Sequence, residues 1–502
     1  IFLHKVIYCI KRLNNYYDSI NEIGTRGLQI RFIPYGINFK YKIWRVCFMV
    51  NKKLVAAGVV MSMVASSLVG CGGSSEEGNV GDSAQIYFLN FKPEIADVYK
   101  SVAEDYEKET GVKVKVETAA SGDYEQTLKS EMAKSEAPTI FQINGPVGYN
   151  NWKDYCANLK DTDLYSHLSD KSLAVTDGDG VYGIPYAVEG YGIIYNQEIM
   201  DKYITLANKK TNITSVDDIN NFDILKEVVE DMQANKDELG IDGVFASTSM
   251  SSGNRWRWDT HLANLPFYYE FKDESEDDTQ IIDTGLASDT VEFKYNDKYK
   301  NIFDLYLDNS CTEKGLLGNK SVDDSMSEFA LGKCAMVQNG NWAWAQIKDV
   351  DGNVVKQDDI KFLPIYTGIE GEESQGICIG TENYFAVNSK ASEAEQQASI
   401  DFINWLFTSD TGKSYVVGDL GFIAPFDTFT EDERPLDPLS KQVMEWMEKD
   451  NIKNVNWIFQ SFPSEKFKET FNDALLEYVQ GTQDWNYVVK TVKDDWKLEK
   501  AQ

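Results

Sequence analysis

The sequence predicts an α/β protein with two domains, and three observations carry this prediction. Residues 84–89 read as a strand, residues 93–110 carry apolar side chains at helical spacing, and residues 112–117 alternate strictly between apolar and polar. Strand, helix and strand within about 35 residues form a βαβ unit, which implies a parallel sheet. The part of the chain past residue 70, roughly 430 residues, has a length that usually divides into two domains.

Further elements follow in order along the chain. Residues 138–143 predict a second buried strand of the first domain, and residues 196–330 are richer in helical patterns. A helix is predicted over 341–348, a strand over 360–364 and a long helix over 391–409. The end of the chain, 436–500, is predicted to be helical. With 42% hydrophobic and 13% aromatic residues, the chain can bury large cores.

The segment from Met49 to Cys71 predicts secretion and a lipid anchor. A short basic stretch, Met49 to Lys53, precedes the uncharged apolar residues 54–64. That run is too short to span a bilayer and is typical of a signal peptide. Leu68 to Cys71 (LVGC) then fits the lipobox of bacterial lipoproteins. We therefore expect a signal peptide over 49–70, lipidation of Cys71 and a flexible tether over 71–83, which is rich in Gly, Ser and acid.

Residues 1–48 lie upstream of this signal, and no methionine precedes Met49. The codons of Trp44, Arg45 and Val46 can encode a ribosome-binding sequence at the right place for a start at Met49. We expect 1–48 to be an untranslated leader. The alternative is a real, cytoplasm-facing extension.

Charge excludes several classes of partner. The sequence has 80 Asp and Glu against 49 Lys and Arg, a net charge of −31. Such a surface repels nucleic acid and anionic membranes, so we expect no nucleic-acid partner and membrane contact through the lipid alone. The acidic run 273–278 predicts a solvated loop, with calcium binding as the alternative.

Motifs for catalysis and cofactors are missing or fail in context. Residues 178–183 match GxGxxG, but they lead into Ile184 and Pro185 rather than a helix, which predicts a turn and no pyrophosphate site. HExxH and GxSxG do not occur, and past the signal only His167 and His261 remain. We expect no catalytic residue, no cofactor and no metal.

The cysteines past Cys71 leave two alternatives open. Their spacing is unlike that of metal ligands, and they permit either disulfides in one of three pairings or free thiols. These residues are Cys156, Cys311, Cys334 and Cys378.

Four segments occur in a fixed order behind the lipobox. They are 181–198 (VYGIPYAVE…YNQE), 329–344 (FALGKCAM…NGNWAW), the predicted helix 391–409 and the tail 457–478. In this order they resemble the extracellular solute-binding proteins of bacterial carbohydrate ABC transporters, family 1, the maltose-binding-protein-like group. The resemblance implies a periplasmic-binding-protein-like fold of type II, with two discontinuous α/β lobes that close on a ligand about a hinge.

By matching position, the resemblance implies a first lobe of 84–188 plus 364–425 and a second lobe of 189–363 plus 426–502. The crossings should lie near Val188 to Gly190, near Lys361 to Leu363 and between 425 and 434. The implied protein is a lipid-anchored, monomeric receptor outside the cell. It captures a carbohydrate, expected to be an oligosaccharide, and delivers it to the permease subunits. The alternatives are a receptor for a peptide or polyamine and a surface glycoside hydrolase with two carboxylates.

A sugar presents hydroxyls and C–H faces, which bind polar groups and aromatic rings respectively. Glu189 and Tyr191 share one face of a predicted strand, and Glu189 matches a ligand-binding carboxylate of the family; the alternative is a hinge ion pair. Gly340 and Asn341 look like a helix N-cap. Trp342 matches the family's stacking position, whereas Trp344 should point to another side, into the core.

Weaker candidates come from chemistry and position. In residues 255–259 (RWRWD), Arg255 and Trp256 have suitable chemistry, with a packed lobe surface as the alternative. The two tryptophans of this run share a face if it is extended and oppose each other if it is helical. Asn90, Lys92 and Asn144 follow predicted strands of the first lobe, where ligands of α/β proteins bind.

Overall fold

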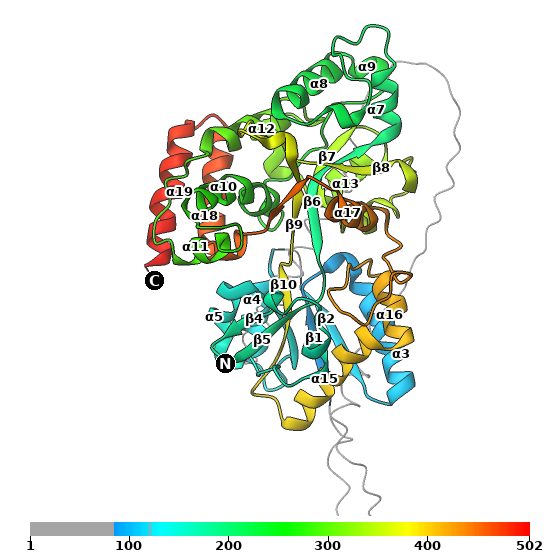
Figure 1. Cartoon of the computed structure of the whole chain (residues 1–502), viewed down its shortest axis with the longest axis vertical. Coiled ribbons are helices and arrows are strands. Elements are labelled where there is room, and N and C mark those ends of the chain that lie inside the picture. The colour runs from blue at the N-terminus through cyan, green and yellow to red at the C-terminus, as the bar shows by residue number, and fades with distance from the viewer. Residues whose placement is uncertain (1–84, 120–121, 502) are drawn as a thin grey trace, which may run out of the picture. The chain divides into compact units, whose positions relative to one another are not determined.

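The computed structural model describes residues 85–119 and 122–501 (Figure 1). The chain divides into two units, residues 1–79 and 80–502, and every described residue belongs to the second. The predicted leader, signal peptide, Cys71 and tether lie outside the described residues. Within the described residues, no helix is long and apolar enough to cross a membrane.

Two sheets organise the second unit into two α/β lobes, which confirms the predicted fold (Figure 1). The first sheet has the strand order β2-β1-β3-β10-β5-β4. β1 pairs in parallel with β2 and β3, and α3 connects β1 to β2 as the predicted βαβ unit. β10 returns antiparallel between β3 and β5. The strands are β1 Ile86–Asn90, β2 Val114–Thr118, β3 Ile140–Asn144, β4 Val175–Asp177, β5 Gly180–Pro185 and β10 Asn383–Val387.

The second sheet is built around one long strand, β6, in which all residues are buried. β6 pairs along one edge with β7, and along the other with β9 at its start and β8 at its end. β11 extends the sheet in parallel beside β9. The strands are β6 Glu189–Asn196, β7 Met336–Gly340, β8 Ile360–Leu363, β9 Gln375–Gly380 and β11 Lys453–Asn456.

Helices cover both sheets (Figure 1). Those of the first lobe are α3 Ala96–Thr110, α4 Tyr124–Met132, α5 Gly145–Trp152, α6 Asp163–His167, α15 Glu393–Thr408 and α16 Asp410–Val417. Those of the second lobe are α7 Gln197–Ile204, α8 Phe222–Ala234, α9 Lys236–Leu239, α10 Asn264–Glu274, α11 Ile281–Ala287, α12 Asn296–Asp308, α13 Val322–Ala330, α14 Ala343–Ile347, α17 Pro438–Glu448, α18 Glu465–Val479 and α19 Trp485–Lys500.

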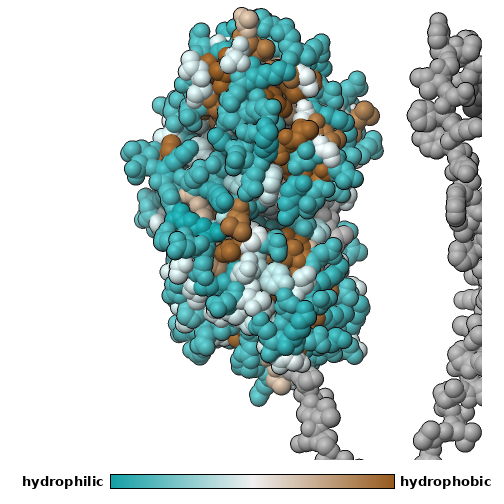
Figure 2. Space-filling view, turned by 90° about the vertical axis from the view of Figure 1, so that its right-hand side faces the viewer, coloured by the Kyte–Doolittle hydropathy of each residue, from teal (hydrophilic) through white to brown (hydrophobic). Residues whose placement is uncertain are grey.

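Each lobe has its own apolar core. Phe88, Tyr99 and Phe385 pack together beneath the first sheet, and Phe267 and Trp496 pack in the second lobe. On the face shown in Figure 2, hydrophobic side chains reach the surface around the junction of the two lobes and on the second lobe, whereas most of the remaining surface is hydrophilic. The buried apolar residues therefore form separate clusters in the two lobes, as expected for lobes that can move relative to each other.

Three segments connect the lobes: residues 186–188 between β5 and β6, residues 381–382 between β9 and β10, and residues 418–437 between α16 and α17. The crossing expected near Lys361 to Leu363 is wrong, because β8 pairs with β6 inside the second sheet. The first-lobe segment 364–425 likewise includes β9, which belongs to the second sheet.

The structure also bears on the glycine-rich segment and on the cysteines. The glycine-rich segment 178–183 makes the turn between β4 and β5, as predicted. The four cysteines of the described chain, whose pairing the sequence left open, are all free thiols.

Candidate ligand-binding cleft

The first lobe contributes a charged turn that follows β1. The Asn90 side chain is fully buried; its amide donates to the Lys92 carbonyl at 2.7 Å, and its oxygen accepts from the Lys92 backbone N–H at 3.1 Å. It also donates to Thr118 Oγ1 at 3.2 Å. Asn90 therefore fixes the turn that presents Lys92, and its own hydrogen-bonding groups are used within the lobe.

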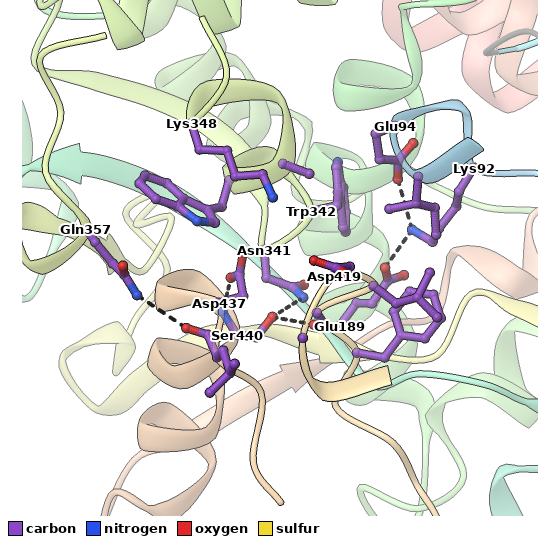
Figure 3. A pocket seen from close by; sticks show the side chains of 18 residues that line it. Lys92, Glu94, Glu189, Asn341, Trp342, Lys348, Gln357, Asp419, Asp437 and Ser440 are labelled. Atoms are coloured by element: carbon purple, nitrogen blue, oxygen red, sulfur yellow. Dashed lines mark hydrogen bonds and ion pairs between the residues drawn. The ribbon is translucent and has the colours of Figure 1, made fainter. Parts of the chain in front are cut away.

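Lys92 meets Glu189 at the base of the cleft (Figure 3). Its Nζ lies 2.6 Å from Glu189 Oε1 and 3.5 Å from Glu94 Oε1, and both members of the closer pair are buried. Burial lowers the pKa of Lys92, but the carboxylates of Glu189 and Glu94 outweigh this effect, and the pKa is raised. Burial raises the pKa of Glu189, and Lys92 opposes the shift. The pair joins the first lobe to the first residue of β6.

Trp342 follows the last strand residue of β7 and stands beside this ion pair (Figure 3). Lys92 Nζ lies 5.0 Å from the centre of its ring. Gly340 makes the placement possible, because a Cβ there would lie 2.1 Å from the Trp342 ring.

Asn341 was predicted to be part of the N-cap of α14, but the N-cap residue is Trp342. The Asn341 amide instead accepts from the Gly190 N–H at 3.0 Å and donates to Ser440 Oγ at 3.0 Å.

A cavity of about 260 Å³ opens on one side of Trp342 (Figure 3). Lys92, Glu189 and Trp342 line it together with residues 418–422 of the third connecting segment. Trp344 also lines it and packs half-buried against the core, so the prediction that Trp344 enters the core holds only in part. Burial raises the pKa of Asp437 on the same wall to about 6.

On the other side of Trp342, aromatic rings gather around His261. The His261 ring lies 4.6 Å from that of Tyr191, 5.0 Å from Trp256 and 5.2 Å from Trp457. The Trp342 ring is 5.7 Å from Trp256 and 6.4 Å from Trp457. These rings form a continuous aromatic cluster from β6, β7 and the segments that flank the second sheet.

Residues 257–262 form a π-helix, η5, and this settles the alternative left open for the two neighbouring tryptophans. Trp258 is buried and donates to the Thr248 carbonyl, whereas Trp256 is half-buried in the aromatic cluster. Arg255 binds Asp259 at 2.5 Å and lies 3.9 Å from Glu465. Its charge is thus satisfied within the second lobe.

Titratable groups at the second crossing have shifted pKa values. Burial and the nearby Glu189 raise the pKa of Glu382 to about 7, against the opposing charges of Lys92 and Lys468. Glu382 lies 3.9 Å from His261 Nε2. Burial lowers the pKa of His261 well below its ordinary value, and the charges of Arg257 and Lys468 act in the same direction. At neutral pH, His261 is therefore an uncharged hydrogen-bonding group.

Asn144 lies at the end of β3, half-buried and opposite Asn383 of β10. The next residue, Gly145, contacts the second lobe so closely that a Cβ there would lie 2.4 Å from Gln460 Oε1. Gln460 also donates to Tyr384 of β10 at 3.0 Å. Asn144 therefore lies where the lobes touch, apart from the cavity beside Trp342.

The structure thus brings Lys92, Glu189, Tyr191, Trp256 and Trp342 together. It places Asn90 beneath them, directs Arg255 into an ion pair and puts Asn144 at a lobe contact. Residues that sequence reasoning missed are His261, Arg257, Glu382, Trp457 and Asp437. Among these, the scarcity of histidine could have singled out His261; the others had no local signal.

Two hinged α/β lobes around a cleft lined by aromatic rings and paired charges define a ligand-binding protein. The chain belongs to the family of bacterial extracellular solute-binding proteins, which it matches over residues 101–441. It is also 28% identical, over 152 residues, to the melibiose/raffinose/stachyose-binding protein MelE of Bacillus subtilis. That match covers 28% of this chain and 34% of the relative.

Solved structures share the fold over nearly their whole length. A chitin oligosaccharide binding protein superposes with a TM-score of 0.63 at 19% identity, covering 84% of this chain and 100% of that one. A sugar transporter protein of Bacillus licheniformis in complex with stachyose gives 0.61 at 18% identity, with coverages of 82% and 100%. RafE in complex with raffinose gives 0.60 at 18% identity, with coverages of 83% and 99%.

Proposed function

We propose that this protein is the receptor of an ABC importer and captures a carbohydrate, in particular an oligosaccharide, between its two lobes. The observation that carries the proposal is Trp342, whose ring stands in the cleft beside the Lys92–Glu189 pair. An aromatic face offers stacking to the C–H face of a sugar, and the adjacent charged groups offer hydrogen bonds to its hydroxyls. Relatives named for binding raffinose and stachyose support the same ligand class.

Charge pairing in the cleft favours a sugar over a polyamine. A polyamine needs several carboxylates that are free to surround its cations. Here Glu189 is paired with Lys92, Asp259 with Arg255, and Glu465 with Lys468 at 2.6 Å. These three carboxylates are thus held by the protein's own cations, and the half-buried rings of Trp256 and Trp342 offer stacking faces to a sugar.

A thermal-shift screen of the purified protein against mono- and oligosaccharides, peptides and polyamines tests this proposal. A ligand that binds only the folded state raises the melting temperature by mass action. We expect stabilisation by at least one oligosaccharide and none by spermidine. Stabilisation by polyamines or peptides alone would contradict the sugar proposal while leaving the family assignment intact.

We further propose that the receptor does not catalyse any reaction of its ligand. The cleft carboxylate Glu189 is ion-paired with Lys92, and the family consists of solute-binding proteins. Prolonged incubation with the tightest-binding oligosaccharide should return it intact by mass spectrometry. Hydrolysis that disappears in Glu189→Gln would instead favour a glycoside hydrolase.

We also propose that the protein acts as a monomer held at the outer face of the membrane by lipid on Cys71, after removal of residues 49–70. Residues 71–83 would then serve as the tether, and 1–48 would be an untranslated leader. The ordered signal and lipobox support this arrangement. Mass spectrometry of the native protein should find an acylated N-terminal Cys71. A peptide from residues 1–45 in the native protein would refute the leader.

A further inference from the structure

One buried guanidinium of the second lobe lacks an ionic partner. Arg257, the first residue of η5, is 1% exposed, and its Nε and Nη2 have no hydrogen-bond partner. Its Nη1 reaches only the Asn254 carbonyl, at 3.5 Å. Its guanidinium carbon lies 4.0 Å from the centre of the Trp256 ring. Among the ion pairs of residues 85–119 and 122–501, none includes Arg257, in contrast to Lys92, Arg255 and Lys468.

Arg257 adjoins the aromatic cluster through Trp256. Trp256, on which it stacks, contacts Trp342, and the Trp342 ring faces Lys92 of the first lobe. Tyr191 on β6, Glu94 of the first lobe and Asp323 of α13 are near enough to influence its pKa. Burial lowers the pKa of Arg257 to about 10, so the group remains charged at neutral pH. A buried charge without a partner costs several kcal/mol, which the folded protein must offset elsewhere.

The unpaired atoms define a specific shape. Nε and Nη2 lie on one edge of the guanidinium plane and point their N–H bonds in the same direction, which is the geometry that binds both oxygens of a carboxylate. Three other buried groups of the cluster also lack hydrogen-bond partners: the Tyr191 hydroxyl, the Trp457 Nε1–H and the ring nitrogens of His261. A ligand that satisfies this set must be rich in acceptors.

We propose that Arg257 binds a carboxylate of the ligand, and that the ligand is an acidic oligosaccharide that contains a uronic acid. This inference rests on the proposed carbohydrate function and narrows it to a substrate class. Trp342 and Trp256 stack on sugar rings, and the Nε–Nη2 edge of Arg257 receives the carboxylate. A neutral sugar hydroxyl would use one donor of that edge and leave the charge uncompensated.

The test uses matched saccharides that differ only in the acid group: galactobiose with digalacturonate, and glucosyl-xylotriose with glucuronosyl-xylotriose. Calorimetry on the purified protein should find the uronate member of a binding pair tighter by about 30-fold or more, the factor that corresponds to a desolvated charge pair. Equal or tighter binding of the neutral member would overturn the acidic ligand and leave the carbohydrate receptor standing. Binding of no saccharide would overturn both.

Variants of Arg257 give a second, independent readout. Arg257→Met should weaken uronate binding by about 30-fold or more, whereas Arg257→Lys, which keeps the charge without the fork, should have an intermediate effect. Without ligand, Arg257→Met should melt at the same or a higher temperature, because it removes an uncompensated buried charge. Arg434→Met, which removes a partly exposed guanidinium paired with Glu431 and Glu448, is the control. Earlier melting of both Arg257 variants, or undiminished uronate binding by Arg257→Met, would overturn the proposal.

Discussion

The two lobes bring different chemistry to the cleft. The first lobe presents a charged turn with Lys92 and Glu94, whereas the second presents the rings of Trp256, Trp342 and Trp457. The turn is held by hydrogen bonds of one buried asparagine, and the rings are held by mutual packing around His261. We infer from this difference that the first lobe, with its charged turn, fixes the geometry between the lobes. The second lobe, with its aromatic rings, supplies most of the binding energy.

The ion pair across the lobes should give the largest effect. Lys92→Met leaves Glu189 buried without its cation, and breaking a buried pair by removing one partner costs about 3–5 kcal/mol. We expect this loss in the unfolding free energy measured by urea denaturation of the unliganded protein. The double variant Lys92→Met/Glu189→Gln should recover most of it, because no unpaired charge remains.

Lys100→Met is the matched control for this experiment. Lys100 forms an ion pair of similar length with Asp97, 2.7 Å, but on the exposed face of α3. Exposed pairs contribute little, so the unfolding free energy of this variant should stay close to that of the wild type. If Lys92→Met were as harmless as Lys100→Met, the first lobe would have no electrostatic role in holding the hinge.

Trp342→Ala should mark the aromatic lobe as the source of affinity. Truncating a stacked aromatic anchor costs on the order of 2–4 kcal/mol of binding energy, or roughly 30- to 1000-fold in Kd. Calorimetry with the best saccharide from the screen measures this directly. Trp405→Ala is the control, since Trp405 packs on Tyr106 of the first lobe, outside the cleft. Equal losses of affinity in both variants would remove Trp342 from the site.

The sequence predicted those parts of this arrangement that depend on residues close together in the chain. The βαβ unit and the long helix α15 follow from periodicity, and the buried strands carry their own apolar runs. Glu189, Trp342 and Lys92 were found because each lies within a recognisable segment or at a strand end. The crossing near Lys361 was misplaced, because nothing in the strand itself shows that β8 pairs with β6 and that the chain leaves the sheet only after β9.

The remaining site residues depend on tertiary structure. Whether residues 255–262 are extended or helical cannot be decided from alternating Arg and Trp. The π-helix places Trp258 in the core and stacks Arg257 on Trp256. Glu382 becomes important only because the hinge brings it near Glu189 and His261. Asn341 resembled a helix cap, but tertiary contacts to Gly190 and Ser440 occupy its amide.

Glu382 also offers a test of the hinge through pH. Its pKa is about 7 in the folded protein, above the ordinary carboxyl value of 4.5. Between these values the folded state holds a proton that the unfolded chain has lost, so stability falls as the pH rises through this window, by up to about 3 kcal/mol. Glu382→Gln should remove this part of the slope in melting curves taken from pH 4.5 to 8. Asp437 titrates in the same window but is present in both proteins, so it cancels in the comparison.

A steeper fall in Glu382→Gln than in the wild type would contradict this assignment, and the shifted carboxyl of the hinge would have to be another group. If the melting temperatures of the two proteins depended on pH in the same way, Glu382 would have the same pKa in the folded and unfolded states. The hinge would then not shift the pKa of Glu382.

The smallest effect concerns the coupling within the aromatic lobe. The Trp256 and Trp342 rings are 5.7 Å apart and inclined by 53°, a separation at which aromatic pairs contribute about 0.5–1.5 kcal/mol beyond their buried area. A double-mutant cycle of Trp256→Ala and Trp342→Ala, measured on the unfolding of the unliganded protein, isolates that term. A coupling energy in this range would mean that the aromatic surface is formed before a ligand binds. Closure of the lobes would then only have to place the charged turn of the first lobe against the ligand. Coupling near zero would mean that the rings are ordered by the ligand, and the entropy of ordering them would then reduce the affinity that Trp342 can supply.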